Sequence, residues 1–147
     1  MLRVEKSVLI EYSAQQMFDL VEDIENYPQF LPWCSETRID FRDEKRTVAT
    51  MYADFHGIQA HFTTENAKEA PFWMTMKLVE GPFRHLEGGW RFKPLGENAC
   101  KIDFHLDYEF SNRLVEKIAG PMFDQMANTF VEVSVKRAHQ VYGAPNG

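Results

Sequence analysis

Apolar and polar positions alternate over residues 2–11, where Leu2, Val4, Val8 and Ile10 share one face. This period of two predicts a half-buried β-strand. A helix start follows, because Ser13 and Gln16 form an S-x-x-Q capping box ahead of apolar positions at helical spacing. The pattern therefore predicts a strand followed by a short helix.

A proline-containing segment, residues 26–34, comes next. Pro28 and Pro32 remove backbone donors and disfavour helix at the residues before them, so one long continuous helix is excluded here. The segment nevertheless carries Tyr27, Phe30 and Trp33. We expect it to fold back as a second short helix or turn whose aromatic side chains cover an apolar region.

From residue 36 to residue 110 the period is again two, and the strands are separated by turn signals such as Gly81-Pro82. The clearest strand is residues 100–110, in which every second position is apolar. Short turns between successive strands predict an antiparallel meander with one apolar and one solvated face. Gly88-Gly89 interrupts one strand and is typical of a bulge or bend.

Residues 112–142 return to a helical period with a broad apolar face. Pro121 lies within this stretch and predicts a kink rather than an end. We therefore expect an α+β fold, in which a curved antiparallel sheet of about seven strands wraps around a long C-terminal helix, with two short helices after the first strand. One domain, 1–147, accounts for the chain, with an ordered core of about 2–142.

Composition narrows the class of function. The chain has 147 residues and a net charge of −6, so the electrostatic field of the whole protein does not attract nucleic-acid phosphates. We therefore expect no DNA partner. Arg3, Glu5 and Lys6 break up the N-terminal apolar residues, unlike a signal peptide, and no apolar run approaches the length of a membrane span. We expect a cytoplasmic protein, monomeric, with Cys34 and Cys100 as free thiols.

Several motifs together carry a resemblance to a known family. They are YSAQQM at 12–17, YPQFLPWC at 27–34, GPF at 81–83, GGW at 88–90 and FHLDYEF at 104–110. With the predicted order of elements, the chain resembles the START-like or helix-grip superfamily. Within it, the chain is similar to the polyketide cyclase/dehydrase, coenzyme-Q-binding group, and most of all to bacterial ribosome association toxins.

That resemblance implies two functions, which the residues alone do not indicate. Quinone-binding relatives hold a polyprenyl quinone such as ubiquinone between sheet and helix, in support of cellular respiration. The toxins bind the large ribosomal subunit and block association of the subunits. Either role needs no cofactor beyond a bound ubiquinone or other isoprenoid lipid.

The aromatic excess, with 12 Phe and 14% aromatic residues overall, favours the ligand-holding role. A curved sheet under a single helix is expected to enclose more volume than short side chains fill, and flexible Met residues suit a variable apolar guest. The segment from Tyr27 to Trp33 is expected to act as a lid. The predicted ligand-binding residues are Tyr27, Phe30, Trp33, Phe55, Phe62, Met74, Met76, Trp90, Phe104, Leu106, Phe123, Met126 and Phe130.

Other chemistry is weaker in the pattern. A cyclase or aromatase needs polar groups inside the groove, such as Tyr52 or Tyr108, whereas most ionisable strand residues fall on the outward register. The five His and two Cys lack metal-ligand spacing, so we expect no metal site and no catalytic residue. Candidate ribosome contacts are the short basic groups Arg42-Lys45-Arg46, Arg84-His85, Arg91-Lys93 and Lys136-Arg137.

Overall fold

The computed structural model describes residues 1–55 and 57–143, except for the side chains of Phe55 and Ile58. Within these residues the chain forms seven strands, two α-helices and one 3-10 helix. In chain order they are β1 (Leu2–Ile10), α1 (Ala14–Glu22), η1 (Ile24–Gln29), β2 (Cys34–Arg42), β3 (Arg46–Phe55), β4 (Ile58–Glu69), β5 (Trp73–Glu80), β6 (Phe83–Pro94), β7 (Cys100–Phe110) and α2 (Arg113–Tyr142). No helix in this part of the chain is both long enough and apolar enough to cross a bilayer.

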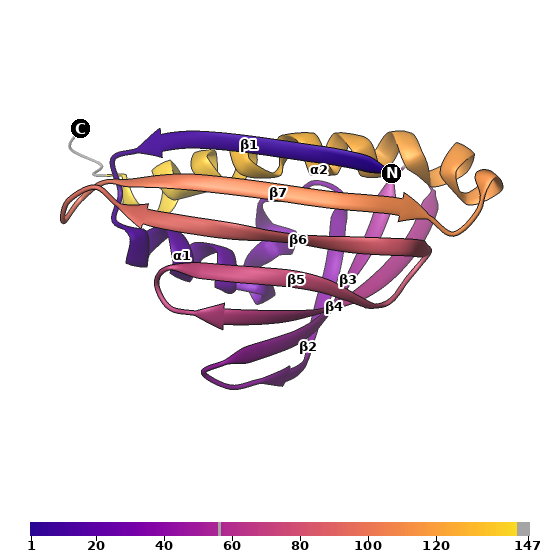
Figure 1. Cartoon of the computed structure of the whole chain (residues 1–147). Helices are drawn as coiled ribbons and strands as arrows, with labels where there is room; N and C mark the ends of the chain where they lie inside the picture. The colour runs from indigo at the N-terminus through magenta and orange to yellow at the C-terminus, as the bar shows by residue number, and fades with distance from the viewer. Residues whose placement is uncertain (56, 144–147) are drawn as a thin grey trace.

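The strands form one antiparallel sheet in the order β1-β7-β6-β5-β4-β3-β2. Figure 1 shows α2 running lengthwise beside β1 and β7, while β3 and β4 cross behind the front strands, so that the sheet curls around the helix. The exposed edge strand β2 has irregular pairing with β3, with register shifts between Cys34 and Glu36 and between Ile39 and Phe41. The predicted α+β helix-grip architecture is confirmed.

Each of the two α-helices begins after a residue whose side chain caps its first turn. The Ser13 hydroxyl accepts a hydrogen bond from the Gln16 backbone N–H, and the Gln16 side chain accepts one from the Ser13 N–H, so the predicted capping box is present. Asn112 caps α2 by accepting from the Val115 N–H. Pro121 lies inside α2 without ending it, as expected.

The double glycine in β6 pairs with β7 without a bulge, which was one of the two expected roles. Gly88 pairs with Leu106 and Gly89 with His105 in continuous register. A β-carbon at Gly88 would lie 2.3 Å from the His105 carbonyl oxygen and 2.9 Å from Cδ1 of Leu106. Gly88 is therefore required because β7 approaches too closely for any side chain.

A buried ion pair fastens α1 to the inner face of the sheet. The Lys68 ammonium on β4 contacts the Glu22 carboxylate at the end of α1, and the Lys68 and Glu22 side chains are only 7% and 17% exposed. Lys68 also donates to the Thr47 hydroxyl over 2.9 Å, and that hydroxyl donates to Glu22 over 3.2 Å. The three side chains thus satisfy one another away from water, as buried charges require.

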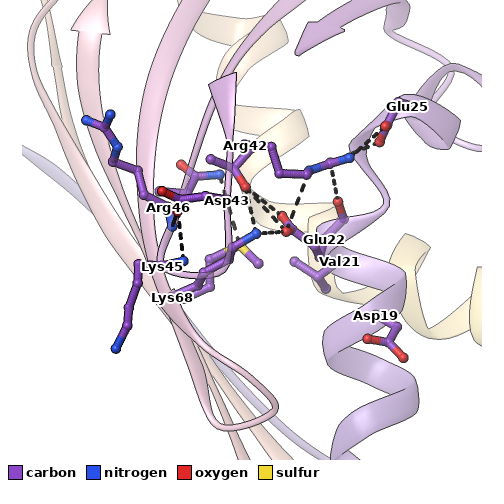
Figure 2. Close-up of polar contacts among 12 residues, drawn as sticks. Asp19, Val21, Glu22, Glu25, Arg42, Asp43, Lys45, Arg46 and Lys68 are labelled. Carbon is purple, nitrogen blue, oxygen red and sulfur yellow. Dashed lines mark hydrogen bonds and ion pairs between the residues drawn. The ribbon is translucent and has the colours of Figure 1, made fainter. Parts of the chain in front are cut away.

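Arg42, the last residue of β2, extends this cluster toward solvent (Figure 2). Its guanidinium donates to both Glu25 carboxylate oxygens, at 2.7 and 3.0 Å, and to the Glu22 backbone carbonyl at 3.1 Å. The Arg42 hydrogen bond lowers the pKa of Glu25 from its usual value. Arg42 therefore also satisfies a carbonyl that the end of α1 leaves without a helical partner.

Replacing Gly88 with Ala should destabilise the fold by about 3 kcal/mol, because the new methyl group would overlap the β7 backbone. Urea denaturation measures the change. Gly120→Ala is the matched control, since a β-carbon there meets nothing closer than 3.6 Å. It should leave stability unchanged or raise it by up to about 1 kcal/mol through better helix propensity. Equal effects of the two changes would contradict the steric explanation.

Lys68→Met should cost about 3 kcal/mol of unfolding free energy, because it leaves the Glu22 carboxylate partly buried without its main partner. The double variant Lys68→Met with Glu22→Leu should recover part of that loss in the same denaturation experiment. Lys45→Met, on an exposed turn residue, is the control and should change stability little. A double variant as unstable as the single one would argue against an ion-pair effect.

Candidate functional site

A small apolar cavity lies between α2 and the inner face of the sheet, with a volume of about 40 Å³. Its wall combines strands β3 to β7, the segment before β2 and four positions of α2. The wall residues are Trp33, Met51, Phe62, Thr64, Met76, Leu86, Phe104, Leu106, Phe123, Met126, Ala127 and Phe130. Every strand from β3 to β7 thus contributes side chains to one space beneath the helix.

Eight of the predicted ligand-binding residues lie on this wall: Trp33, Phe62, Met76, Phe104, Leu106, Phe123, Met126 and Phe130. The prediction omitted Met51, Thr64, Leu86 and Ala127. The signal for these four was present, since each continues an inward-facing row at strand or helix period. None of the four is aromatic, whereas the predicted site consists mainly of aromatic side chains.

Four other predicted residues are not on the wall. Trp90 and Met74 are fully buried in the core, and Trp90 packs against Phe104 at a ring distance of 4.6 Å. Tyr27 is buried, and its hydroxyl donates to the Val21 carbonyl. The Arg137 guanidinium lies over the Phe30 ring, with its Cζ atom 5.3 Å from the ring centroid. The side chain of Phe55, also predicted, lies outside the described part of the structure.

The expected lid is therefore reduced to one residue at the cavity. Of Tyr27, Phe30 and Trp33, only half-buried Trp33 borders it. Tyr27 instead supports the helix, with its ring 5.8 Å from that of Phe130. Elsewhere in the segment Leu31 is buried, whereas Gln29 and Pro32 are exposed.

Aromatic side chains of α2 close the groove at two points. Phe123 has its ring 4.7 Å from Phe83 and 4.8 Å from Tyr108, and it also meets the rings of Phe62 and Phe110. Phe130, two turns further on, packs against Tyr27, Trp90 and Phe104. The cavity is bounded at the helix by these two groups of rings, with Met126 and Ala127 between them.

The cavity is much smaller than the sequence suggested. About 40 Å³ is close to the space of a single water molecule, whereas drug-sized ligands occupy pockets of roughly 300–1,000 Å³. In this conformation large aromatic side chains occupy most of the space between sheet and helix. Any lipid-sized guest must displace side chains to enter.

A buried polar run starts at Thr64 on the cavity wall and continues along the same inner face of β4. The Thr64 hydroxyl donates to the Asn66 side-chain oxygen over 2.9 Å, and Lys68 follows two residues later in the ion pair of Figure 2. The sequence prediction did not identify this run. Its signal was the alternation itself, since Thr64, Asn66 and Lys68 continue the inward row of Phe62.

The ionisable residues of β7 face away from the groove, as predicted, because His105 is exposed while Phe104 and Leu106 are buried. Tyr108 is buried and donates to Asp124 over 2.6 Å, and burial with that acceptor raises its pKa above the usual value. Tyr52 is hydrogen-bonded to Arg38 near the surface. Neither tyrosine lies on the cavity wall, so neither hydroxyl is placed to act as an acid or base on a ligand there.

The side chains that could bind a metal ion are the two cysteine thiols and those of His, Asp and Glu. Cys34 and Cys100 are both buried and free, and burial raises the pKa of the Cys34 thiol to about 11, which keeps it protonated. Among the residues described, no three His, Cys, Asp or Glu side chains gather as a metal would require. The predicted basic groups are partly neutralised, since Arg46 pairs with Glu65 and Arg84 with Glu109.

Comparison with known proteins places this geometry in a family. Residues 10–133 match the family of polyketide cyclase/dehydrase and lipid transport proteins. The Ribosome association toxin RatA of Escherichia coli K12 is 42% identical over 98% of this chain and 91% of its own. The Coenzyme Q-binding protein COQ10 homolog B of Xenopus laevis is 29% identical over 94% of this chain, which spans 58% of that protein.

A solved structure gives the same fold. The Zhui aromatase/cyclase from Streptomyces sp. R1128 superposes with a TM-score of 0.82 over 98% of both chains, at 14% identity. At that identity the likeness concerns the fold alone. The match over most of the chain and the 42% identical relative show that this protein belongs to the polyketide cyclase/dehydrase and lipid transport family.

Proposed function

We propose that this protein binds an apolar ligand of the prenyl-quinone type in the groove between α2 and the sheet, without transforming it chemically. The observation that carries the proposal is the wall of the cavity, in which aromatic rings and three Met side chains from both layers converge on one space. Burying isoprenoid carbon against such a wall is favourable at about 25 cal/mol per Å² of apolar surface.

The composition of the wall supports opening of the cavity. Met51, Met76 and Met126 have unbranched, flexible side chains that can repack around a guest. Trp33 and Phe130 are only partly buried, so they can move with less loss of packing than the core rings. A ligand would then replace contacts between side chains with contacts to its own chain.

Two further points favour a binding role over catalysis. The relative named as a Coenzyme Q-binding protein aligns with 94% of this chain. The polar side chains nearest the groove are occupied, because Thr64 donates to Asn66, Lys68 pairs with Glu22 and Tyr108 donates to Asp124. A cyclase would need such groups directed at its substrate.

Ala127→Leu should abolish ligand binding, because the larger side chain fills the small cavity at the centre of its helical wall. We expect protein purified from its own host to yield about one prenyl quinone per chain on denaturing extraction and mass spectrometry. The variant should yield at least about tenfold less.

Ala67→Leu on the exposed face of β4 is the matched control and should retain the ligand. Circular dichroism would confirm that both variants are folded. Wild-type protein that is empty as purified, and that shows no heat of binding with decylubiquinone in calorimetry, would contradict the proposed function.

The 42% identity to a protein named Ribosome association toxin favours a second candidate function, binding to the large ribosomal subunit. The outer face of β6 offers a contact surface for it. Arg91 and Lys93 are exposed there, and neither takes part in the ion pairs among the residues that the structure describes. Lys101 lies opposite Lys93 on β7 and pairs with Asp103, which lies opposite Arg91, so this basic surface also carries one carboxylate.

If this second function holds, the protein should co-sediment with large ribosomal subunits. The double change Arg91→Glu with Lys93→Glu should weaken that association and make it less dependent on salt. Ala127→Leu should sediment like the wild type, because it alters only the groove. Sedimentation of the charge-reversed variant equal to that of wild type would exclude this surface.

A further inference from the structure

Ser134 on α2 is an exception among the buried polar side chains. Ser134 is only 2% exposed. Among the residues that the structure describes, every other buried side-chain nitrogen or oxygen has a hydrogen-bond partner, but the Ser134 hydroxyl has none. Elsewhere on the same helix Thr129 donates to the Gln125 carbonyl over 2.7 Å. Ser134 makes no equivalent bond to the carbonyl one turn back.

Such a hydroxyl is costly to the empty protein. Desolvating a hydroxyl without a partner is unfavourable, and Ser is a poorer helix former than Ala. Ala would fit the same buried position without either penalty. Stability alone therefore does not account for a serine here, and an unpaired buried group in a native protein needs another explanation.

The position of Ser134 relates it to the groove. Ala127 and Phe130 are on the cavity wall, and Ser134 continues their row one turn beyond Phe130. Residues four apart on a helix are neighbours, about 5–6 Å apart at their β-carbons. The Cα–Cβ bond of a helical residue is tilted toward the helix N-terminus, so the side chain of Ser134 leaves the backbone in the direction of Phe130.

We infer that Ser134 binds the polar end of the ligand, which is an apolar molecule with an oxygen at one end, such as the carbonyl or hydroxyl of a quinone headgroup. The inference rests on the proposed ligand-binding function. A serine hydroxyl both donates and accepts, so it can bond to the oxidised or the reduced form. The hydrocarbon part of the ligand then lies against Met126, Phe123 and the sheet.

Phe130 separates the cavity from Ser134. It is only partly buried, and its ring leans on Tyr27, Trp90 and Phe104 edge-on, at centroid distances of 5.3–5.9 Å. A ligand that extends from the cavity to Ser134 has to displace this one side chain. The ligand thus enlarges the small cavity along the helix, in the direction where an unsatisfied polar group lies.

Ser134→Ala distinguishes a ligand-binding role of the hydroxyl from a structural one. The change should make the ligand-free protein more stable and should lower its affinity for the ligand. We expect its melting temperature to rise by about 2–4 °C, since the unpaired hydroxyl is removed. Calorimetry should show its affinity for decylubiquinone falling about fivefold, the worth of one neutral hydrogen bond. Its affinity for phenyldecane, which has no oxygen, should be unchanged.

Ser7→Ala on the exposed face of β1 is the control and should alter neither quantity. If Ser134→Ala binds decylubiquinone as tightly as wild type, the inference is overturned while the proposed function stands. If wild type binds phenyldecane and decylubiquinone equally well, the polar contact is likewise excluded. Failure of the wild type to bind either compound overturns the proposed function itself and the inference with it.

Discussion

The contact of Phe123 with four aromatic rings is the interaction on which the rest of the structure depends. Its partners come from β4, β6 and β7, so one side chain of α2 ties together strands that are far apart in the sequence. A sheet this curved has an apolar inner face that must be covered, and α2 is the only element long enough among those described to cover it. The groove exists because the helix meets the sheet first at Phe123 and again at Phe130, with smaller or more flexible side chains between.

The same arrangement explains why the cavity is small without being fully packed. Rings at both ends hold the helix at a fixed distance from the sheet, while Met side chains take up the remaining space between them. Interiors built from rigid rings and flexible thioethers can be dense and still be adaptable. The buried ion pair of Lys68 and Glu22 lies outside this adaptable region, where it holds α1 against β3 and β4 whether or not the groove is occupied.

Much of this structure could be predicted from the order of residues. Alternation gave the inward face of β7 correctly from Cys100 to Phe110, and the Ser13 capping box placed the start of α1. Periodicity shows which way a side chain points but not how deep it lies, so Trp90 and Met74 were assigned to the groove although they are in the core. Alternation along β4 places Lys68 on the inner face, but its pairing with Glu22, 46 residues away, has no local signal in the sequence. Ser134 lies on a face that reads as ordinary core, and only three-dimensional packing reveals that its hydroxyl has no partner.

The irregular edge strand β2 has a consequence for how this protein behaves at high concentration. An open sheet ends in backbone groups that a second chain can pair with, which is a route to aggregation. In β2 the two register shifts break the strand into short stretches, and Arg38, Asp40 and Arg42 place charges along it. A neighbouring chain would have to strip water from those charges in return for only a few regular hydrogen bonds. The β2 edge of the curved sheet is thereby a poor template for self-association.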